Sequence, residues 1–272
     1  MKKKRFFGKH NLAFLLLLAG LINLSFVWAW SKGHNRFTES ERAREESNPV
    51  SAANLPIVPV LDSNITTTSN LYDLLGLSLA GLNRQVFEFA LNGFYKMKEA
   101  GKLTNEAVLS IADFSKPSNK KRLYIIDLKA NRLLFNTYVA HGVNSGTDYA
   151  HAFSNAPSSN KSSLGFYITA DTYIGKNGYS MHLLGQEKGF NDNAFDRDIV
   201  MHAANYVNEA ITKGMGHIGR SWGCPAVPPR LNKPIIDKIK NGTCFFIYAP
   251  DKNYISQSQL ITAPVMQPTV QK

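Results

Sequence analysis

Residues Met201–Val227 read MHAANYVNEAITKGMGHIGRSWGCPAV, and we expect the rest of the chain to be organised around this segment. The segment contains a cysteine, two histidines and a serine within a short, Gly-rich span, which is sufficient equipment for thiol chemistry. Cys224 is the candidate nucleophile. His202 and His217 are the candidate bases.

A cysteine thiol is mostly protonated at neutral pH, so a nucleophilic Cys224 needs a base or a positive field nearby. We expect the backbone amides of Gly223 and Cys224 to form an oxyanion hole, because glycine permits the backbone conformation that such a turn requires. Arg220 places positive charge close to the thiol in sequence. The turn is therefore predicted to favour a thiolate and to bind a tetrahedral intermediate.

His202 is the preferred base because it ends an apolar run, residues 199–201, which predicts a strand that fixes the imidazole. His217 lies among glycines in a predicted loop, and its role stays open. Ser221 stands beside the turn, where it orients either the base or a backbone group. Other histidines, at His141, His151 and His182, are too scattered to predict a metal site, and we expect neither a metal nor a cofactor.

The amino terminus has the features of an export signal. Residues 2–9 are rich in Lys and Arg, and an uncharged Leu-rich stretch follows to about residue 30. This stretch is either a cleaved signal peptide or a membrane anchor, and both place the remaining chain in the periplasm or cell envelope. Residues 1–29 carry five basic residues and no acidic ones, so the rest of the chain has a charge of about +6 instead of +11. This moderate charge does not indicate a nucleic-acid partner.

The remaining chain divides into three predicted parts. Residues 31–70 form a polar, flexible linker, residues 71–250 form one domain, and residues 251–272 form a mobile tail. The domain is predicted to begin with a helical part, 71–115, which contains helices at 71–75, 82–99 and 105–112. Further along, apolar runs and Gly or Asn turns predict strands at 123–128, 133–139, 165–169, 181–184, 199–202 and 244–248, with one helix at 231–240. The fold class is therefore mainly β.

The segment around Cys224 resembles the active site of the murein L,D-transpeptidase catalytic domain family, in particular a branch whose turn reads Gly-Arg-Ser-x-Gly-Cys-Pro. His202 matches the family's first histidine, and Ser221, Gly223 and Cys224 match its turn. Trp222 stands where the wider family has a second histidine. Further matching motifs are DFSKPS at 113–118, HGVNSG at 141–146, SSLGFYIT at 162–169 and GFNDNAFDRDIVMHAANYV at 189–207.

The resemblance covers about residues 71–250 and implies a β-sandwich with peripheral helices. It also implies an exported cysteine acyl-transferase that acts on peptidoglycan stem peptides through a Cys224 thioester and cross-links the cell wall. Two alternatives stay open. The same cysteine would serve an L,D-carboxypeptidase or another murein hydrolase. A disulfide between Cys224 and Cys244 would instead indicate a non-catalytic envelope-binding protein.

Overall fold

The computed structural model describes residues 65–262. The predicted signal segment 1–30, most of the predicted linker and the end of the predicted tail lie outside the described residues. Within 65–262, no helix is long and apolar enough to cross a membrane. The linker prediction is wrong at its end, because residues 65–70 belong to helix α2 (Ile65–Leu74). This helix is held to the domain by Tyr72, which is buried and donates its hydroxyl hydrogen to the Leu82 carbonyl.

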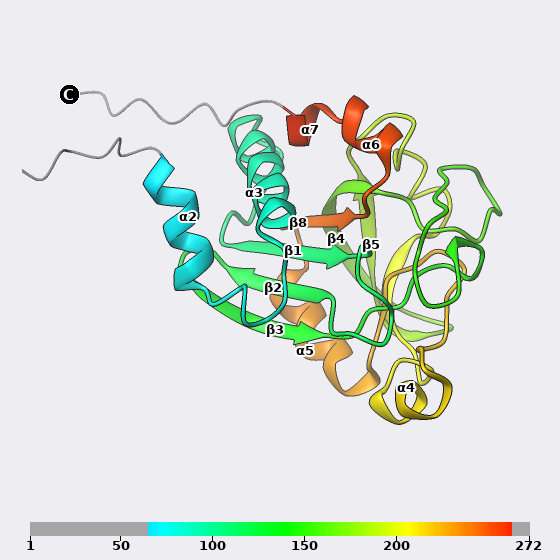
Figure 1. The fold of residues 1–272 in the computed structure, drawn as a ribbon. Helices are drawn as coiled ribbons and strands as arrows, with labels where there is room; N and C mark the ends of the chain where they lie inside the picture. The colour runs from blue at the N-terminus through cyan, green and yellow to red at the C-terminus, as the bar shows by residue number, and fades with distance from the viewer. Residues whose placement is uncertain (1–64, 263–272) are drawn as a thin grey trace, which may run out of the picture. The chain divides into compact units, whose positions relative to one another are not determined.

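Eight strands form one sheet in the order β3-β2-β1-β8-β4-β5-β6-β7 (Figure 1). In chain order the strands are β1 (Val108–Asp113), β2 (Leu123–Asp127), β3 (Arg132–Thr137), β4 (Gly165–Gly175), β5 (Gly178–Gly185), β6 (Val200–Ala203), β7 (Ala226–Val227) and β8 (Cys244–Tyr248). The pairs β1–β8 and β6–β7 are parallel and the others are antiparallel. The predicted mainly β fold with peripheral helices is confirmed.

Strand β1 corrects one sequence-based expectation. The prediction of a helix at 105–112 is wrong, because Val108–Asp113 is a strand in which every residue is buried. Strands β2 and β8 flank it on both sides. A strand buried on both faces gives a continuous apolar run, which short sequence windows do not distinguish from a buried helix. Before this strand, Thr104 donates its hydroxyl hydrogen to the Asn241 carbonyl, which precedes β8 by a few residues.

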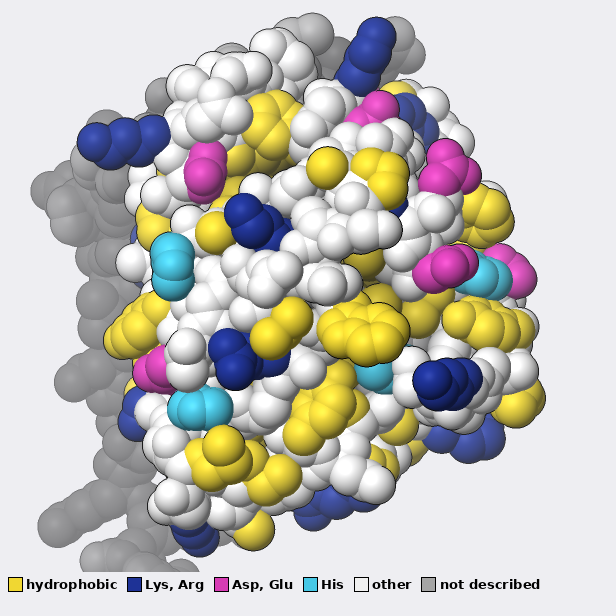
Figure 2. All heavy atoms as spheres, turned by 90° about the vertical axis from the view of Figure 1, so that its right-hand side faces the viewer, with side chains coloured by type: hydrophobic (Ala, Val, Ile, Leu, Met, Phe, Trp, Pro, Cys, Tyr) yellow, Lys and Arg dark blue, Asp and Glu magenta, His cyan; other side chains and the backbone are white. Residues whose placement is uncertain are grey.

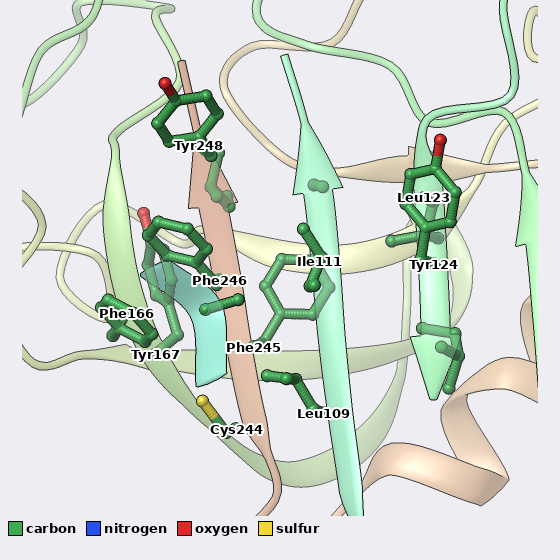
Figure 3. Packing of buried hydrophobic residues seen from close by; sticks show 14 of the residues in the cluster. Leu109, Ile111, Leu123, Tyr124, Phe166, Tyr167, Cys244, Phe245, Phe246 and Tyr248 are labelled. Carbon is green, nitrogen blue, oxygen red and sulfur yellow. The ribbon is translucent and has the colours of Figure 1, made fainter. Parts of the chain in front are cut away.

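Helix α3 (Arg84–Glu99) covers the sheet and confirms the predicted helix at 82–99. Its N-cap, Asn83, accepts a hydrogen bond from the Gln85 amide, which satisfies one of the free amides at the helix start. Gly93 allows close approach to β4, because a Cβ there would lie 2.0 Å from the Phe166 ring. Phe166 in turn stacks on Phe246 of β8 at 4.2 Å between ring centroids (Figure 3).

The carboxyl-terminal part is ordered further than we predicted. Helix α5 (Pro229–Ile239) matches the predicted helix at 231–240, but α6 (Lys252–Gln257) and α7 (Gln259–Thr262) replace the first half of the predicted mobile tail. Tyr254 is fully buried, and its hydroxyl donates to the buried Glu187 carboxylate at 2.8 Å. Ser258 donates to the same carboxylate. These buried polar contacts hold α6 and α7 on the domain.

Candidate active site

The turn that carries Cys224 is closed by Ser221. The Ser221 hydroxyl donates to the Cys224 carbonyl at 2.6 Å and accepts from the Gly223 amide at 3.1 Å. Gly223 has a φ of 124°, and a Cβ there would lie 2.8 Å from the Lys161 carbonyl oxygen. Only glycine fits this position. Two roles were open for Ser221, orienting the base or orienting a backbone group. In the structure its hydroxyl orients backbone groups of the turn.

The Gly223 amide is consequently used inside the turn, which corrects the expectation that it faces an oxyanion. The Cys224 amide has no carbonyl or side-chain oxygen as acceptor among residues 65–262. It lies beside its own sulfur and lowers the pKa of the thiol. One of the two predicted oxyanion donors, the Cys224 amide, thus remains available.

Two of the sequence motifs pack against this turn. The Ser221 amide donates to the His141 carbonyl at 2.9 Å, and the Val143 amide donates to the Ser221 carbonyl at 2.7 Å. The Ser162 hydroxyl donates to the Gly223 carbonyl at 3.1 Å and accepts from the Gly142 amide. The short helix η1 (Val143–Ser145) lies in the first of these motifs. Backbone hydrogen bonds on both sides therefore hold the turn rigid.

The sulfur of Cys224 contacts the segment that leads into β6. It accepts a hydrogen bond from the Val200 amide at 3.5 Å and donates its own hydrogen to the Asp198 carbonyl at 3.4 Å. Asp198 has a φ of 52°, a left-handed conformation that is uncommon for residues other than glycine. Burial raises the pKa of the Cys224 thiol, while the Val200 amide and Arg197 lower it. In this arrangement the thiol is protonated and needs a base.

Both cysteines are free thiols. Cys244 is fully buried in β8, where its sulfur lies 4.0 Å from the sulfur of Met97 on α3, and burial raises the pKa of its thiol. Its place in the core is drawn in Figure 3. The Cys224–Cys244 disulfide considered above is not formed.

His202 lies in β6, the strand that pairs with β7 just beyond the cysteine turn. In the register of this parallel pair His202 is opposite Ala226, so Cys224 falls beside Val200. The His202 Nδ1–H donates to the Ala203 carbonyl at 2.9 Å, which leaves Nε2 with a free lone pair. Burial lowers the pKa of His202, so the imidazole is neutral at pH 7. His202 thus has the chemical form of a general base.

The other two candidates near the turn lie differently. His217 donates from Nδ1 to the Ile218 carbonyl at 2.8 Å, in the loop after helix α4 (Glu209–Met215). This helix, of seven residues, lies in the interval between His202 and Cys224. Arg220 donates to the Gly146 carbonyl at 3.2 Å. The cation that lowers the pKa of Cys224 is Arg197, not Arg220.

Arg197 is a candidate functional residue that the sequence analysis does not include. Its guanidinium donates to the Ser154 and Lys161 carbonyls, both at 2.8 Å, and to the hydroxyls of Ser159 and Ser163. It thereby fastens the segment from Ser154 to Ser163 to the residues that touch the thiol. The only signal in the sequence was a charged side chain inside the Asx-rich loop before β6.

A buried arginine braces the opposite side of the turn. Arg122 is fully buried, donates twice to the Val139 carbonyl and donates to His141 Nδ1 at 2.7 Å. His141 Nε2–H donates to the Gly146 carbonyl at 3.2 Å, the oxygen that Arg220 also contacts. Burial, followed by the charge of Arg122, lowers the pKa of His141 to about 4. His141 is therefore a neutral structural link and not a second base.

Several aromatic side chains belong to the segments near the thiol. Trp222 is 77% exposed, and Tyr173 and Phe195 are also exposed. After burial, the charge on Cys224 raises the pKa of both Tyr173 and Tyr206, which places their phenols in the field of the sulfur. Figure 2 shows the side of the domain that lies to the right in Figure 1, where hydrophobic side chains gather with histidines among them. Such a surface suits a substrate with both apolar and polar groups.

Comparison with solved structures gives weak overall matches. One match is a Mycobacterium tuberculosis L,D-transpeptidase in complex with a faropenem-derived adduct, with 12% identity, a TM-score of 0.31 and coverage of 53% of this chain and 60% of that chain. A second is Enterococcus faecium L,D-transpeptidase, with 13% identity, a TM-score of 0.30 and coverage of 52% of this chain and 50% of that chain. A third is a fused Zn-dependent amidase/peptidase/peptidoglycan-binding protein from Clostridium acetobutylicum, with 13% identity, a TM-score of 0.32 and coverage of 75% of this chain and 71% of that chain. The chain spans a little over half the length of the first structures it matches, 59% in two of them.

A search of curated proteins found no significant match. The family comparison is decisive instead, because residues 79–248 match the family described as the L,D-transpeptidase catalytic domain. This range takes in α3, all eight strands, the cysteine turn and the strand that carries His202. The chain therefore belongs to the L,D-transpeptidase catalytic domain family.

Proposed function

We propose that this protein is an exported L,D-transpeptidase that cross-links peptidoglycan stem peptides through a thioester on Cys224. The observation that carries the proposal is the pairing of two strands: β6 holds a neutral His202 with a free Nε2, and the neighbouring turn presents Cys224 beside the same strand. Family membership supports the substrate class. The basic and then apolar residues 1–30 support export, by a cleaved signal or by an anchor.

The first half-reaction forms the thioester. His202 Nε2 takes the proton of the Cys224 thiol, which breaks its hydrogen bond to Asp198, and the sulfur attacks the carbonyl of an L-configured centre that precedes a D-residue. The Cys224 amide binds the oxyanion. The His202 imidazolium then gives its proton to the leaving amine, and the D-residue departs. Arg197 stabilises the thiolate that forms on the way.

The second half-reaction transfers the acyl group. An amine of a second stem peptide attacks the thioester carbonyl, loses one proton and forms a new amide bond, while the C–S bond breaks and the sulfur regains a proton. If water attacks instead, the product is a free carboxylate, as expected for an L,D-carboxypeptidase. Both outcomes use the same acyl-enzyme, and the product mass separates them.

The test is to incubate the purified full-length protein with muropeptides and to identify products and acyl-enzyme by mass spectrometry. We expect cross-linked products with the wild type and none with Cys224→Ala. Cys244→Ala is the matched control, because it removes the fully buried thiol and keeps the partly buried thiol of Cys224. Since one of the matched structures holds a faropenem-derived adduct, faropenem is a suitable second probe. Identical products with wild type and Cys224→Ala would contradict the proposal.

A further inference from the structure

A second imidazole lies on the far side of β6 from the cysteine. His182 of β5 is opposite Val200 of β6 in the antiparallel register, and the Val200 amide points to the sulfur of Cys224. Because the amide and carbonyl of one strand residue point the same way, Val200 and His182 form a non-hydrogen-bonded pair, with Cα atoms about 4.5 Å apart. Directly paired residues share a face of the sheet.

His202 shares this face with His182. It is two residues beyond Val200, and side chains two apart along a strand point to the same side. His182 and His202 are therefore diagonal neighbours on one face of the β5–β6 pair. The side chain of His182 is 23% exposed, so a substrate on this face can reach it.

The orientation of His182 is fixed by neighbours on β4. Its Nδ1 lies 3.0 Å from a carboxylate oxygen of Asp171, so Nδ1 carries the proton and Nε2 has a free lone pair. The two nitrogens of an imidazole point away from one another at a wide angle. A Nδ1 bound on the β4 side therefore turns Nε2 toward β6, beyond which the thiol lies.

Aromatic rings restrain the same imidazole. The Tyr173 ring stacks on His182 at 4.6 Å and 13°, and Phe195 approaches it at 5.4 Å between ring centroids. The Tyr173 ring thus covers one face of the imidazole, and the Phe195 ring lies tilted against it. The phenol of Tyr173 also lies in the field of Cys224. Tyr173 thus links the group comprising Asp171, Tyr173, His182 and Phe195 to the surroundings of the thiol.

We propose that His182, oriented by Asp171, is the general base for the acyl acceptor, while His202 serves the acyl donor. This inference rests on the proposed function and adds a residue to its second half-reaction. His182 Nε2 takes a proton from the attacking amine as the new C–N bond forms at the thioester carbonyl. The C–S bond then breaks, the departing thiolate takes a proton from solvent, and His182 returns its proton to solvent. Atoms and charges balance without any further reactant.

The test separates the two half-reactions in the full-length protein. A stem tetrapeptide ending in D-alanine is the acyl donor and D-methionine is the acceptor, with the thioester on Cys224 followed by rapid quench and intact mass. For His182→Gln we expect thioester formation within about twofold of wild type and its aminolysis slowed about tenfold or more. Asp171→Asn, which disturbs only the orientation of His182, should slow aminolysis less. His151→Gln is the matched control and should behave as wild type in both steps.

Chemical rescue distinguishes a base from a residue that is needed only for the structure. Imidazole added to His182→Ala should restore part of the aminolysis rate and leave the acylation rate unchanged. Aminolysis at the wild-type rate in His182→Gln, or an equal slowing of both steps, would overturn the inference and leave the proposed function intact. If the wild type forms no thioester on Cys224, the proposed function fails, and the inference fails with it.

Discussion

The Val200 amide donates to the sulfur of Cys224 at 3.5 Å, and two residues further along the same strand His202 presents its free Nε2. One strand therefore both holds the thiol and carries its base. The thiol is kept in place by backbone groups on one side and by the Ser221 turn on the other. Because the position of the thiol is fixed, the charges nearest to it affect its pKa.

Replacing Arg197 should raise the pKa of Cys224, because Arg197 is the cation that lowers it. In Arg197→Met the thiolate is less favoured, so the rise of alkylation rate with pH should move to higher pH. Iodoacetamide labelling across pH, read by mass, measures this shift. Arg220→Met is the matched control, since Arg220 bonds to the Gly146 carbonyl. Equal shifts in the two variants would contradict the assignment.

Substituting Gly223 should destabilise the cysteine turn. Gly223→Ala places a Cβ 2.8 Å from the Lys161 carbonyl oxygen at a φ of 124°. A strained backbone position of this kind costs about 1–3 kcal/mol. Gly214→Ala is the control, because nothing lies within 4 Å of its Cβ and the residue is in helix α4. Urea unfolding should show a lower unfolding free energy for Gly223→Ala and a slightly higher one for Gly214→Ala. A similar change in both variants would argue against backbone strain at Gly223.

The docking of the carboxyl-terminal helices depends on Tyr254. Tyr254→Phe removes one donor from the buried Glu187 carboxylate, so we expect a loss of about 1–3 kcal/mol in unfolding free energy. Tyr179→Phe removes an exposed hydroxyl contact to Asp237 and should lower the unfolding free energy less than Tyr254→Phe does. Limited proteolysis after α5 should also speed up in Tyr254→Phe only. Unchanged proteolysis would show that other contacts hold α6 and α7.

The sequence predicts those features of the molecule that depend on residues close together in the chain. His202 at a strand end and Cys224 after a glycine are both visible in a short window, and the structure places His202 on β6 and Cys224 in the turn that leads into the neighbouring strand β7. Arg197 was missed because its influence on the thiol arises only when the loop before β6 closes on residues 154–163. The tail was misjudged for a similar reason, since Tyr254 and Glu187 are 67 residues apart.

Acid should destabilise the fold through His141. Its pKa is about 4 in the folded protein, below the ordinary value of 6.5, because it is buried and faces Arg122. Above pH 6.5 the imidazole is neutral in both states. Between pH 6.5 and 4 the unfolded chain binds a proton that the folded chain does not, so stability falls as the pH falls. The full loss is about 3 kcal/mol, and it levels off below pH 4.

The variant His141→Asn isolates this contribution. Asparagine keeps an acceptor for Arg122 but has no titrating group, so the variant should be less stable at pH 7 and should lose less stability on acidification. Urea unfolding at several pH values between 7 and 4 measures both slopes. The carboxyls of Asp113 and Glu187, whose pKa values burial raises, act in the opposite direction in both proteins and cancel in the difference. Equal slopes for wild type and His141→Asn would show that folding does not lower the pKa of His141.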